Sequence, residues 1–241
     1  YSPTNRTLKI SELNALSGKQ RIFLSGSHKN DNEFKFDVKV MNVLLEHILP
    51  ENPVFQLEGK ATVSGSIERS ALNNKMNLVG EVKDVIINQQ DVGDFKINSN
   101  GNTKTNIYYS NLDLVNNSQN SLSIIGIWEG LEDTKLNYDL TFDSLDLSFL
   151  SPLGKEAINE FDGVVKGFVN ISGPLDDLKH NGSLTLSQGG FRVPYLNVGY
   201  TVEQTEVQLY DQVFAFREAQ MKDVDQGTTA VLKGTFSHTN F

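Results

Sequence analysis

Two short stretches of the chain hold acidic residues whose spacing could do chemistry. Asp176 and Asp177 are adjacent, and paired carboxylates are what glycoside hydrolases use for acid–base work. Residues 222–229, KDVDQGTT, begin like a calcium-binding loop. The aspartate pair, however, lies between Pro174 and Asn181-Gly182, a composition typical of a turn, and the loop lacks the later glutamate that binds calcium with both oxygens. Both stretches are better explained as surface turns.

Histidine and cysteine, the other usual ligands and nucleophiles, form no constellation. The chain has no cysteine, which excludes disulfides, thiol catalysis and cysteine metal sites. The serine-hydrolase, phosphate-loop and zinc-protease motifs are absent as well. We therefore expect no enzyme activity, no cofactor and no metal site. The four histidines are scattered, with no partner at ligand spacing: His28, His47, His180 and His238.

The composition indicates a wide, shallow sheet rather than a deep core. Hydrophobic residues make up 38% of the 241 residues, below the roughly 45–50% of globular chains. The net charge of −9 repels nucleic acid, so no nucleic-acid partner is expected. No apolar run approaches the about 20 residues that cross a bilayer. Because the chain begins with Tyr1, we expect it to be a fragment of a longer protein.

Most of the chain alternates apolar and polar residues with a period of two. In residues 183–187, SLTLS, both leucines fall on one face of a strand. Similar runs, bounded by Gly, Asn and Asp, recur throughout. They predict an all-β fold, an elongated repeat of antiparallel strands folded into a taco-like or β-solenoid trough with an apolar groove. About sixteen strands would make a sheet roughly 75 Å long.

Two segments break this alternation, and they occupy equivalent places in two copies of one pattern. Residues 42–49 and 153–161 have helical spacing, so we expect two short helices, the first ended by Pro50. GKATVSGSIE at 59–68 matches GFVNISGPLD at 167–176. The chain therefore divides into three predicted parts: 1–32, the end of a preceding repeat; 33–138, a first repeat unit; and 139–241, a second unit truncated at its end.

The second unit resembles a known family. The motifs that carry the resemblance are Ser172-Gly173-Pro174, Gly189-Gly190-Phe191, Val193-Pro194-Tyr195-Leu196 and Leu232-Lys233-Gly234. They are similar to the C-terminal region of TamB-like proteins, the translocation and assembly module subunits of the AsmA-like superfamily, in their Bacteroidota form. The similarity is good over 145–238, weaker over 33–128 and thin before residue 30. The upstream copy lacks the Val-Pro-Tyr and Gly-Gly-Phe motifs.

The resemblance, and not the composition, implies a function. TamB-like proteins are anchored in the inner membrane, extend through the periplasm and meet an outer-membrane barrel of the Omp85 class (TamA-, TamL- or BamA-like). They are associated with moving phospholipid toward the outer membrane and with assembly of outer-membrane proteins. The resemblance therefore implies a periplasmic location, an apolar groove for phospholipid or acyl chains, and an Omp85-family partner.

The expected groove residues are the apolar members of the alternating runs. Gly189 and Gly190 are expected to form a bulge or bend within them. In the second unit the groove candidates are Val165, Val169, Ile171, Leu184, Leu186, Phe191, Val193, Leu196, Val198, Tyr200, Phe214, Phe216, Leu232 and Phe236. In the first unit and at the junction they are Phe34, Phe36, Val38, Val40, Met76, Leu78, Leu136, Leu140 and Phe142.

Other interpretations stay open at this point. The same apolar residues could fill the closed cores of tandem β-sandwiches in a surface adhesin or a glycan-binding protein. A hydrolase on a jelly roll would need converging carboxylates, which the sequence does not offer. A groove requires one apolar strip that continues across the junction near 128–145, whereas sandwiches require two closed cores.

Overall fold

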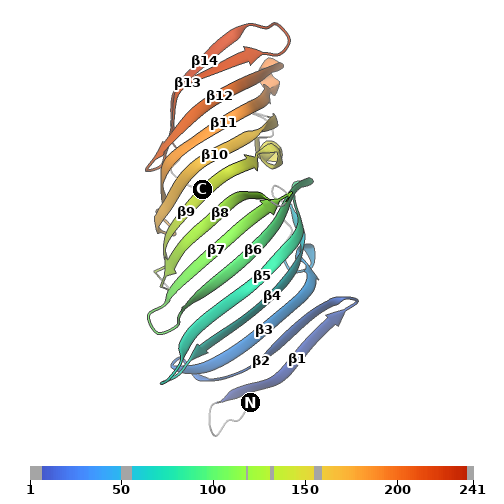
Figure 1. The fold of residues 1–241 in the computed structure, drawn as a ribbon, viewed down its shortest axis with the longest axis vertical. Coiled ribbons are helices and arrows are strands. Elements are labelled where there is room, and N and C mark those ends of the chain that lie inside the picture. The colour runs from blue at the N-terminus through green and yellow to red at the C-terminus, as the bar shows by residue number, and fades with distance from the viewer. Residues whose placement is uncertain (1–6, 50–55, 118, 131–132, 155–158, 238–241) are drawn as a thin grey trace.

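The computed structural model describes residues 7–49, 56–117, 119–130, 133–154 and 159–237 as one sheet of fourteen strands (Figure 1). The strands lie in the sheet in chain order, and each pairs antiparallel with its neighbours in sequence. They are β1 (Leu8–Ser17), β2 (Gln20–Asn30), β3 (Glu33–Leu44), β4 (Leu57–Arg69), β5 (Asn74–Ile87), β6 (Gln90–Asn102), β7 (Ile107–Asn116), β8 (Gln119–Glu129), β9 (Lys135–Asp146), β10 (Asn159–Pro174), β11 (Lys179–Val193), β12 (Val198–Tyr210), β13 (Val213–Asp223) and β14 (Thr229–Ser237).

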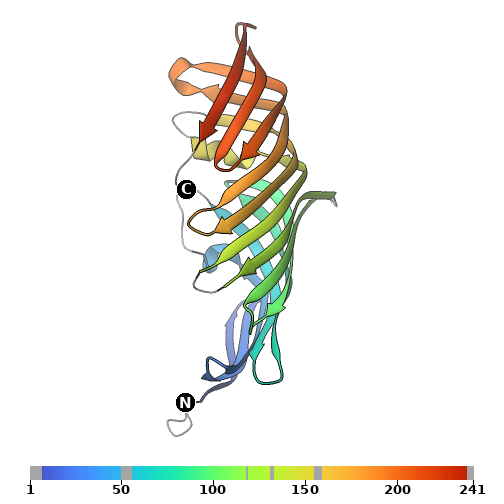
Figure 2. The same ribbon diagram turned by 90° about the vertical axis from the view of Figure 1, so that its left-hand side faces the viewer.

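The predicted all-β, elongated architecture is confirmed. The sheet is long and open, and it bends about its long axis (Figure 2). Fourteen strands at about 4.8 Å spacing extend over roughly 60 Å, somewhat less than expected. The described residues form this one sheet and not two sandwiches, and each half of the sequence contributes strands to it.

The two faces of the sheet differ in chemistry, as strand β9 shows. Leu136, Leu140 and Phe142 are half-buried on one side, whereas Lys135 and Asp139 are exposed on the other. Because neighbouring strands pair in register, this division continues across the sheet. We call the side that carries Leu136, Leu140 and Phe142 the apolar face, and the opposite side the polar face.

Helical segments occupy both predicted positions but are shorter than expected. The first is η1 (Leu45–His47), a single turn that follows β3 directly. The second consists of η2 (Ser148–Leu150) and α1 (Ser151–Gly154), and residues 159–161, predicted as helix, begin β10 instead. Strand pairing overrides the local helical spacing at both places, since Val43 pairs with Ala61 and Asn159 with Arg192. Pro50 and residues 155–158 lie outside the described part of the chain.

The order of elements recurs along the sheet. Strands β3 to β8 form six antiparallel strands with η1 after the first, and β9 to β14 repeat this order with η2 and α1 after the first. A third short segment, η3 (Pro194–Leu196), joins β11 to β12. The predicted boundary at 138/139 falls within β9. None of the helical segments among the described residues is long or apolar enough to span a membrane.

Glycines on the apolar face let aromatic rings of the next strand lie close to the sheet. A Cβ added at Gly126 would lie 2.2 Å from the carbonyl oxygen of Asn137 and 2.7 Å from Cδ1 of Tyr138. At Gly101 a Cβ would lie 2.4 Å from Cδ1 of Tyr108. Each ring therefore takes the space that a side chain would fill on the neighbouring strand, and a glycine is required at these positions.

We predict that Gly126→Ala lowers the free energy of unfolding by about 2 kcal/mol, because β8 and β9 must separate to accept the methyl group. Urea unfolding followed by circular dichroism measures this change. Asn120→Ala, at an exposed position on the same strand, is the control and should change stability by less than about 0.5 kcal/mol. Equal stability of Gly126→Ala and the control would show that the strands are not held at this separation.

Candidate functional site

One line of facing residues crosses the apolar face on all fourteen strands without a polar side chain. Each member is the register partner of the next, so the line follows from pairing and not only from alternation. It crosses the junction of the two halves where Ile124 of β8 pairs with Leu140 of β9, which in turn pairs with Val169 of β10. This central ladder consists of Ala15, Ile22, Val40, Val63, Gly80, Ile97, Leu112, Ile124, Leu140, Val169, Gly182, Leu209, Phe214 and Phe236.

The corresponding line on the polar face is dominated by side chains that prefer water. Lys39 pairs with Ser64 on one part of the sheet, and Asp139 pairs with Asn170 on another. The amide of Asn170 donates hydrogen bonds to Asn137 at 2.9 Å and to Asp139 at 2.8 Å. The sheet therefore presents water-compatible groups on one side only, and its other side requires an apolar covering.

One lateral rim of the apolar face is closed. Here buried residues of several strands form a core, and the helical segments pack over it through Leu45, Leu147 and Phe149. Figure 2 shows both helical segments on the same side of the sheet. The most buried members of this core include Val85 at 1% exposure and Leu114 at 3%. We call this side the closed rim; the opposite ends of the strands form the open rim.

The side-chain amide of Asn88 joins the closed rim to Gln56, which precedes β4, and to Phe149 of η2. Asn88, in the turn between β5 and β6, donates from Nδ2 to the carbonyl of Phe149 at 2.9 Å. Its Oδ1 accepts the backbone N–H of Gln56 at 2.9 Å, and its own N–H donates to the Gln56 carbonyl at 2.9 Å. Asn88 adopts a left-handed backbone with φ of 50°, which asparagine tolerates better than most residues.

The open rim exposes a hollow in the second half of the sheet. Its volume is about 440 Å³, and the turn between β10 and β11 places Leu175 and Leu178 at its mouth. Residues of the five consecutive strands β9 to β13 meet there because the antiparallel register aligns them. Six of the predicted groove residues line this hollow: Leu140, Phe142, Val169, Ile171, Leu184 and Phe214.

Most of the predicted groove residues share the apolar face. They come from both halves of the sequence, and the register joins them through the central ladder and the lines beside it. They are Phe34, Phe36, Val38, Val40, Met76, Leu78, Leu136, Leu140, Phe142, Val165, Val169, Ile171, Leu184, Leu186, Phe214, Phe216, Leu232 and Phe236.

The predicted bulge at the glycine pair is present and separates a second group. Between the pairs Val164–Ser187 and Asp162–Gly190, strand β11 holds one residue more than β10, and the register shifts. Beyond the bulge, Phe191 pairs with Tyr200, and their ring centroids are 5.6 Å apart. Val193 and Val198 follow as the next pair toward η3.

Leu196 does not lie on the strip where the sequence placed it. Pro194 begins η3 instead of continuing the strand, since proline has no N–H to donate to the ladder. Leu196 therefore lies in a turn and is 56% exposed. Leu196 is therefore not one of the residues that share the apolar face.

Sequence reasoning missed apolar-face residues on several strands. Alternation indicates β2, β4, β8 and the end of β12 and also places their inward residues, whereas β6 and β7 are found only in the structure. Trp128, whose strand position indicates a core or groove-lining residue, lies on the apolar face, and its ring stacks on Tyr108 with centroids 4.3 Å apart. The missed residues of the ladder and its neighbours are Ile22, Leu24, Val63, Ile67, Ile97, Tyr108, Leu112, Ile124, Tyr138, Val207 and Leu209.

The residues that could do chemistry remain apart in space. No three His, Asp or Glu side chains gather as metal ligands in the described part of the chain. Asp177 lies in a turn in which its N–H donates to the Pro174 carbonyl at 3.0 Å. Oδ1 of Asp223 accepts hydrogen bonds from the backbone N–H groups of Asp225 and Gln226 at 2.8 and 2.9 Å. The carboxylate therefore stabilises the turn within residues 222–229, the stretch that begins like a calcium-binding loop.

The histidines have separate surroundings. His28 lies 3.8 Å from Asp31, His47 contacts the side-chain amide of Gln20, and the ring of His180 lies 4.8 Å from that of Phe214. His238 lies outside the described residues. Comparison of the chain with protein-family models, with curated proteins and with solved structures finds no match.

We predict that Asn88→Ala lowers the free energy of unfolding by about 2 kcal/mol, because it leaves the Gln56 N–H and the Phe149 carbonyl without their side-chain partner. Hydrogen exchange should show faster exchange at Gln56 than in the wild type. Gln89→Ala changes the exposed neighbour in the same turn and serves as the control. Unchanged exchange and unchanged stability in Asn88→Ala would show that the closed rim does not depend on this amide.

Proposed function

We propose that the apolar face binds the acyl chains of phospholipid and carries them along the sheet. The observation that supports this proposal is the central ladder, which offers an apolar side chain or a glycine on each of fourteen consecutive strands. A closed core would bury this ladder against a second layer. Here the described residues supply cover only at the closed rim.

The energetics of such binding need no catalytic group. Each methylene group that leaves water contributes about 0.8 kcal/mol of binding free energy. An acyl chain on the ladder is therefore spared most of the free energy that its exposure to water would cost. Neighbouring strands present similar residues, which gives successive positions similar affinity. A carrier with many similar sites releases its cargo more readily than one with a single deep site.

The two rims give the lipid an orientation. Leu45, Leu147 and Phe149 seal the closed rim, so acyl chains have no polar exit on that side. At the open rim no helical segment of the described chain packs over the strand ends, and the phosphate-bearing headgroup can stay in water. The lipid therefore lies with its chains on the ladder and its headgroup toward the open rim.

The cellular setting of this proposal comes from the family resemblance. A TamB-like role would place the chain in the periplasm, as part of a longer protein tethered to the inner membrane. The lipid path would then lead from the inner to the outer membrane and end at an Omp85-family barrel. Support for the assembly of outer-membrane proteins is the other task that this resemblance suggests.

Trp128 provides a direct test, since it is the only tryptophan and lies on the apolar face, four residues along β8 from Ile124 of the central ladder. Incubation with vesicles of phosphatidylglycerol that carries brominated acyl chains should quench its fluorescence after the vesicles have been removed by centrifugation. Bromine quenches at short range, so quenching reports acyl chains on the apolar face. Undiminished fluorescence, with no phospholipid found in the protein fraction, would contradict the proposal.

A matched control moves the tryptophan by one residue to the other side of the sheet. In Trp128→Phe/Ile127→Trp the indole lies on the polar face, because neighbouring residues of a strand point to opposite sides. We expect lipid uptake as in the wild type but little quenching. Equal quenching in both proteins would show that the lipid binds without preference for the apolar face.

We further predict that Leu140→Asp reduces phospholipid uptake at least about tenfold, since a charge on the central ladder must be desolvated by any acyl chain above it. Thr141→Asp places the same charge on the polar face of β9 and should leave uptake unchanged. Far-ultraviolet circular dichroism verifies that both variants keep their sheet. Wild-type uptake by a folded Leu140→Asp protein would exclude the ladder as the lipid path.

A further inference from the structure

Arg69 is a charged side chain on the apolar face, at the open rim. It is the last residue of β4, and it pairs with Phe34, whose ring belongs to the apolar face. Ile67 precedes it on the same face by two residues, a distance of about 7 Å along the strand. Its guanidinium carbon lies 5.5 Å from the centre of the Phe34 ring, which is a cation–π geometry.

The guanidinium of Arg69 is held in place but is not neutralised. Nη1 donates to the carbonyl of Asp31 at 3.1 Å, and Nη2 donates to Oδ1 of Asn106 at 2.9 Å. Nε is buried and has no hydrogen-bond partner. No carboxylate of the described residues lies within 4.0 Å of it. Its positive charge also acts on the buried Tyr108: burial raises the pKa of that hydroxyl, and Arg69 opposes the rise.

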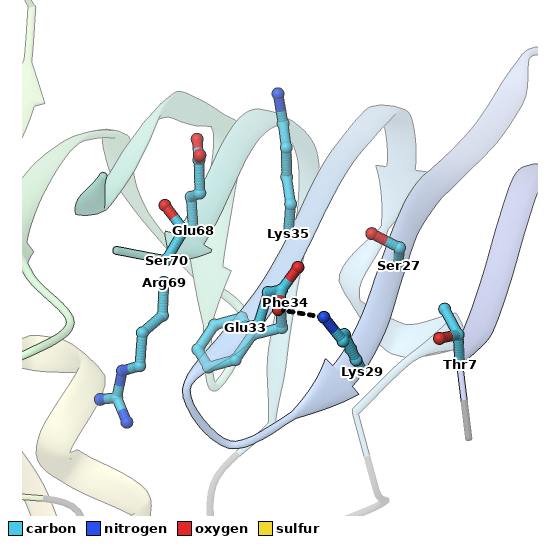
Figure 3. Close-up of a pocket in the computed structure, with 9 residues that line it drawn as sticks. All are labelled: Thr7, Ser27, Lys29, Glu33, Phe34, Lys35, Glu68, Arg69 and Ser70. Atoms are coloured by element: carbon cyan, nitrogen blue, oxygen red, sulfur yellow. Dashed lines mark hydrogen bonds and ion pairs between the residues drawn. The ribbon is translucent and has the colours of Figure 1, made fainter. Parts of the chain in front are cut away.

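Two open hollows meet at Arg69, with volumes of about 690 and 740 Å³. Figure 3 shows the guanidinium pointing away from Glu68, which lies on the other side of β4. Within the first hollow, Lys29 and Glu33 neutralise each other through a contact of 2.7 Å. The second hollow adds Lys104, for which the described residues offer no ion pair. The rim is therefore locally positive on a chain whose net charge is −9.

We propose that Arg69 binds the phosphate of a phospholipid whose acyl chains lie on the apolar face. This inference rests on the proposed lipid-carrying function and adds headgroup recognition to it. Arginine suits a phosphate because its planar N–H groups match two phosphate oxygens at once. Ile67, two residues from Arg69 on the same face, offers the acyl chains of such a lipid an apolar contact beside its phosphate.

The site is built so that its geometry does not depend on the charge. The loop between β6 and β7 is attached to β4 independently of Arg69, because the hydroxyl of the fully buried Thr103 donates to the Glu68 carbonyl at 2.6 Å. Phe34 remains paired in β3 whatever residue occupies position 69. We therefore expect Arg69→Gln to fold, which makes the charge itself testable.

The experiment compares two brominated lipids that differ only in the phosphate-bearing headgroup, phosphatidylglycerol and diacylglycerol, with Trp128 quenching as the readout. Arg69→Gln should weaken phosphatidylglycerol binding about tenfold, the effect of losing one charge-assisted contact. Diacylglycerol binding should stay at the wild-type level. Arg69→Lys, which keeps the charge without the planar fork, should lie between the two. Lys75→Gln removes an equal charge from the polar face and should change neither lipid.

Three outcomes would overturn the headgroup site. Equal losses for both lipids in Arg69→Gln would assign Arg69 to a structural clamp only. Equal phosphatidylglycerol binding by Arg69→Gln and the wild type would show that the phosphate is not bound there. If soluble glycerophosphate displaces phosphatidylglycerol as readily as inorganic phosphate does, the rim would be assigned to a small anion instead of a lipid. Absence of quenching by either lipid in the wild type would instead refute the lipid-carrying function itself.

Discussion

The structure depends on one constraint: an apolar face that extends over fourteen strands has to be kept from water. A second sheet or a layer of helices is the common solution, and the described residues provide neither over most of the face. Instead, the face is partly covered in three ways: the sheet bends, aromatic rings lie close above glycines, and short helical segments pack over one rim. Each of these covers part of the apolar surface, and none seals it. The fold is therefore stable enough to persist while it keeps an apolar surface accessible from one side.

The constraint also explains why the two rims differ. At the closed rim, burial is nearly complete at Val85. Asn88 uses both its side-chain oxygen and its side-chain nitrogen in hydrogen bonds, to Gln56 and to Phe149. At the open rim, Arg69 retains a buried Nε without a partner. A buried donor without a partner costs free energy, and folding alone gives no reason to keep it. The closed rim holds the sheet together, and at the open rim Arg69 keeps a charge that no carboxylate of the described residues neutralises.

Much of this fold could be predicted because strand alternation has a period of two and needs no distant information. SLTLS in β11 and the similar runs elsewhere identify both the strands and their inward side chains. Helical spacing in 42–49 and 153–161 was a weaker guide, because pairing of Val43 and Asn159 with neighbouring strands outweighs local preference. Leu196 was misplaced because alternation says nothing of a proline that ends the strand. Arg69 follows the parity of Gly65 and Ile67, so alternation could have found it, but only the structure shows that it has no carboxylate partner.

Continuity distinguishes this apolar face from a set of separate binding sites. The strand register passes from β8 to β9 without a shift, so Ile124, Leu140 and Val169 form one line where the two predicted repeat units meet. A bulge at this junction would have turned the inward residues of one half toward the polar side. Register shifts occur elsewhere, near the closed rim between Val82 and Val85 in β5 and between Val165 and Gly167 in β10, and near the open rim between His28 and Asn30 in β2. Bulges there increase the local bend without interrupting the ladder. The sheet can therefore curve while an uninterrupted apolar path runs along its middle, and the proposed sliding of an acyl chain depends on this geometry.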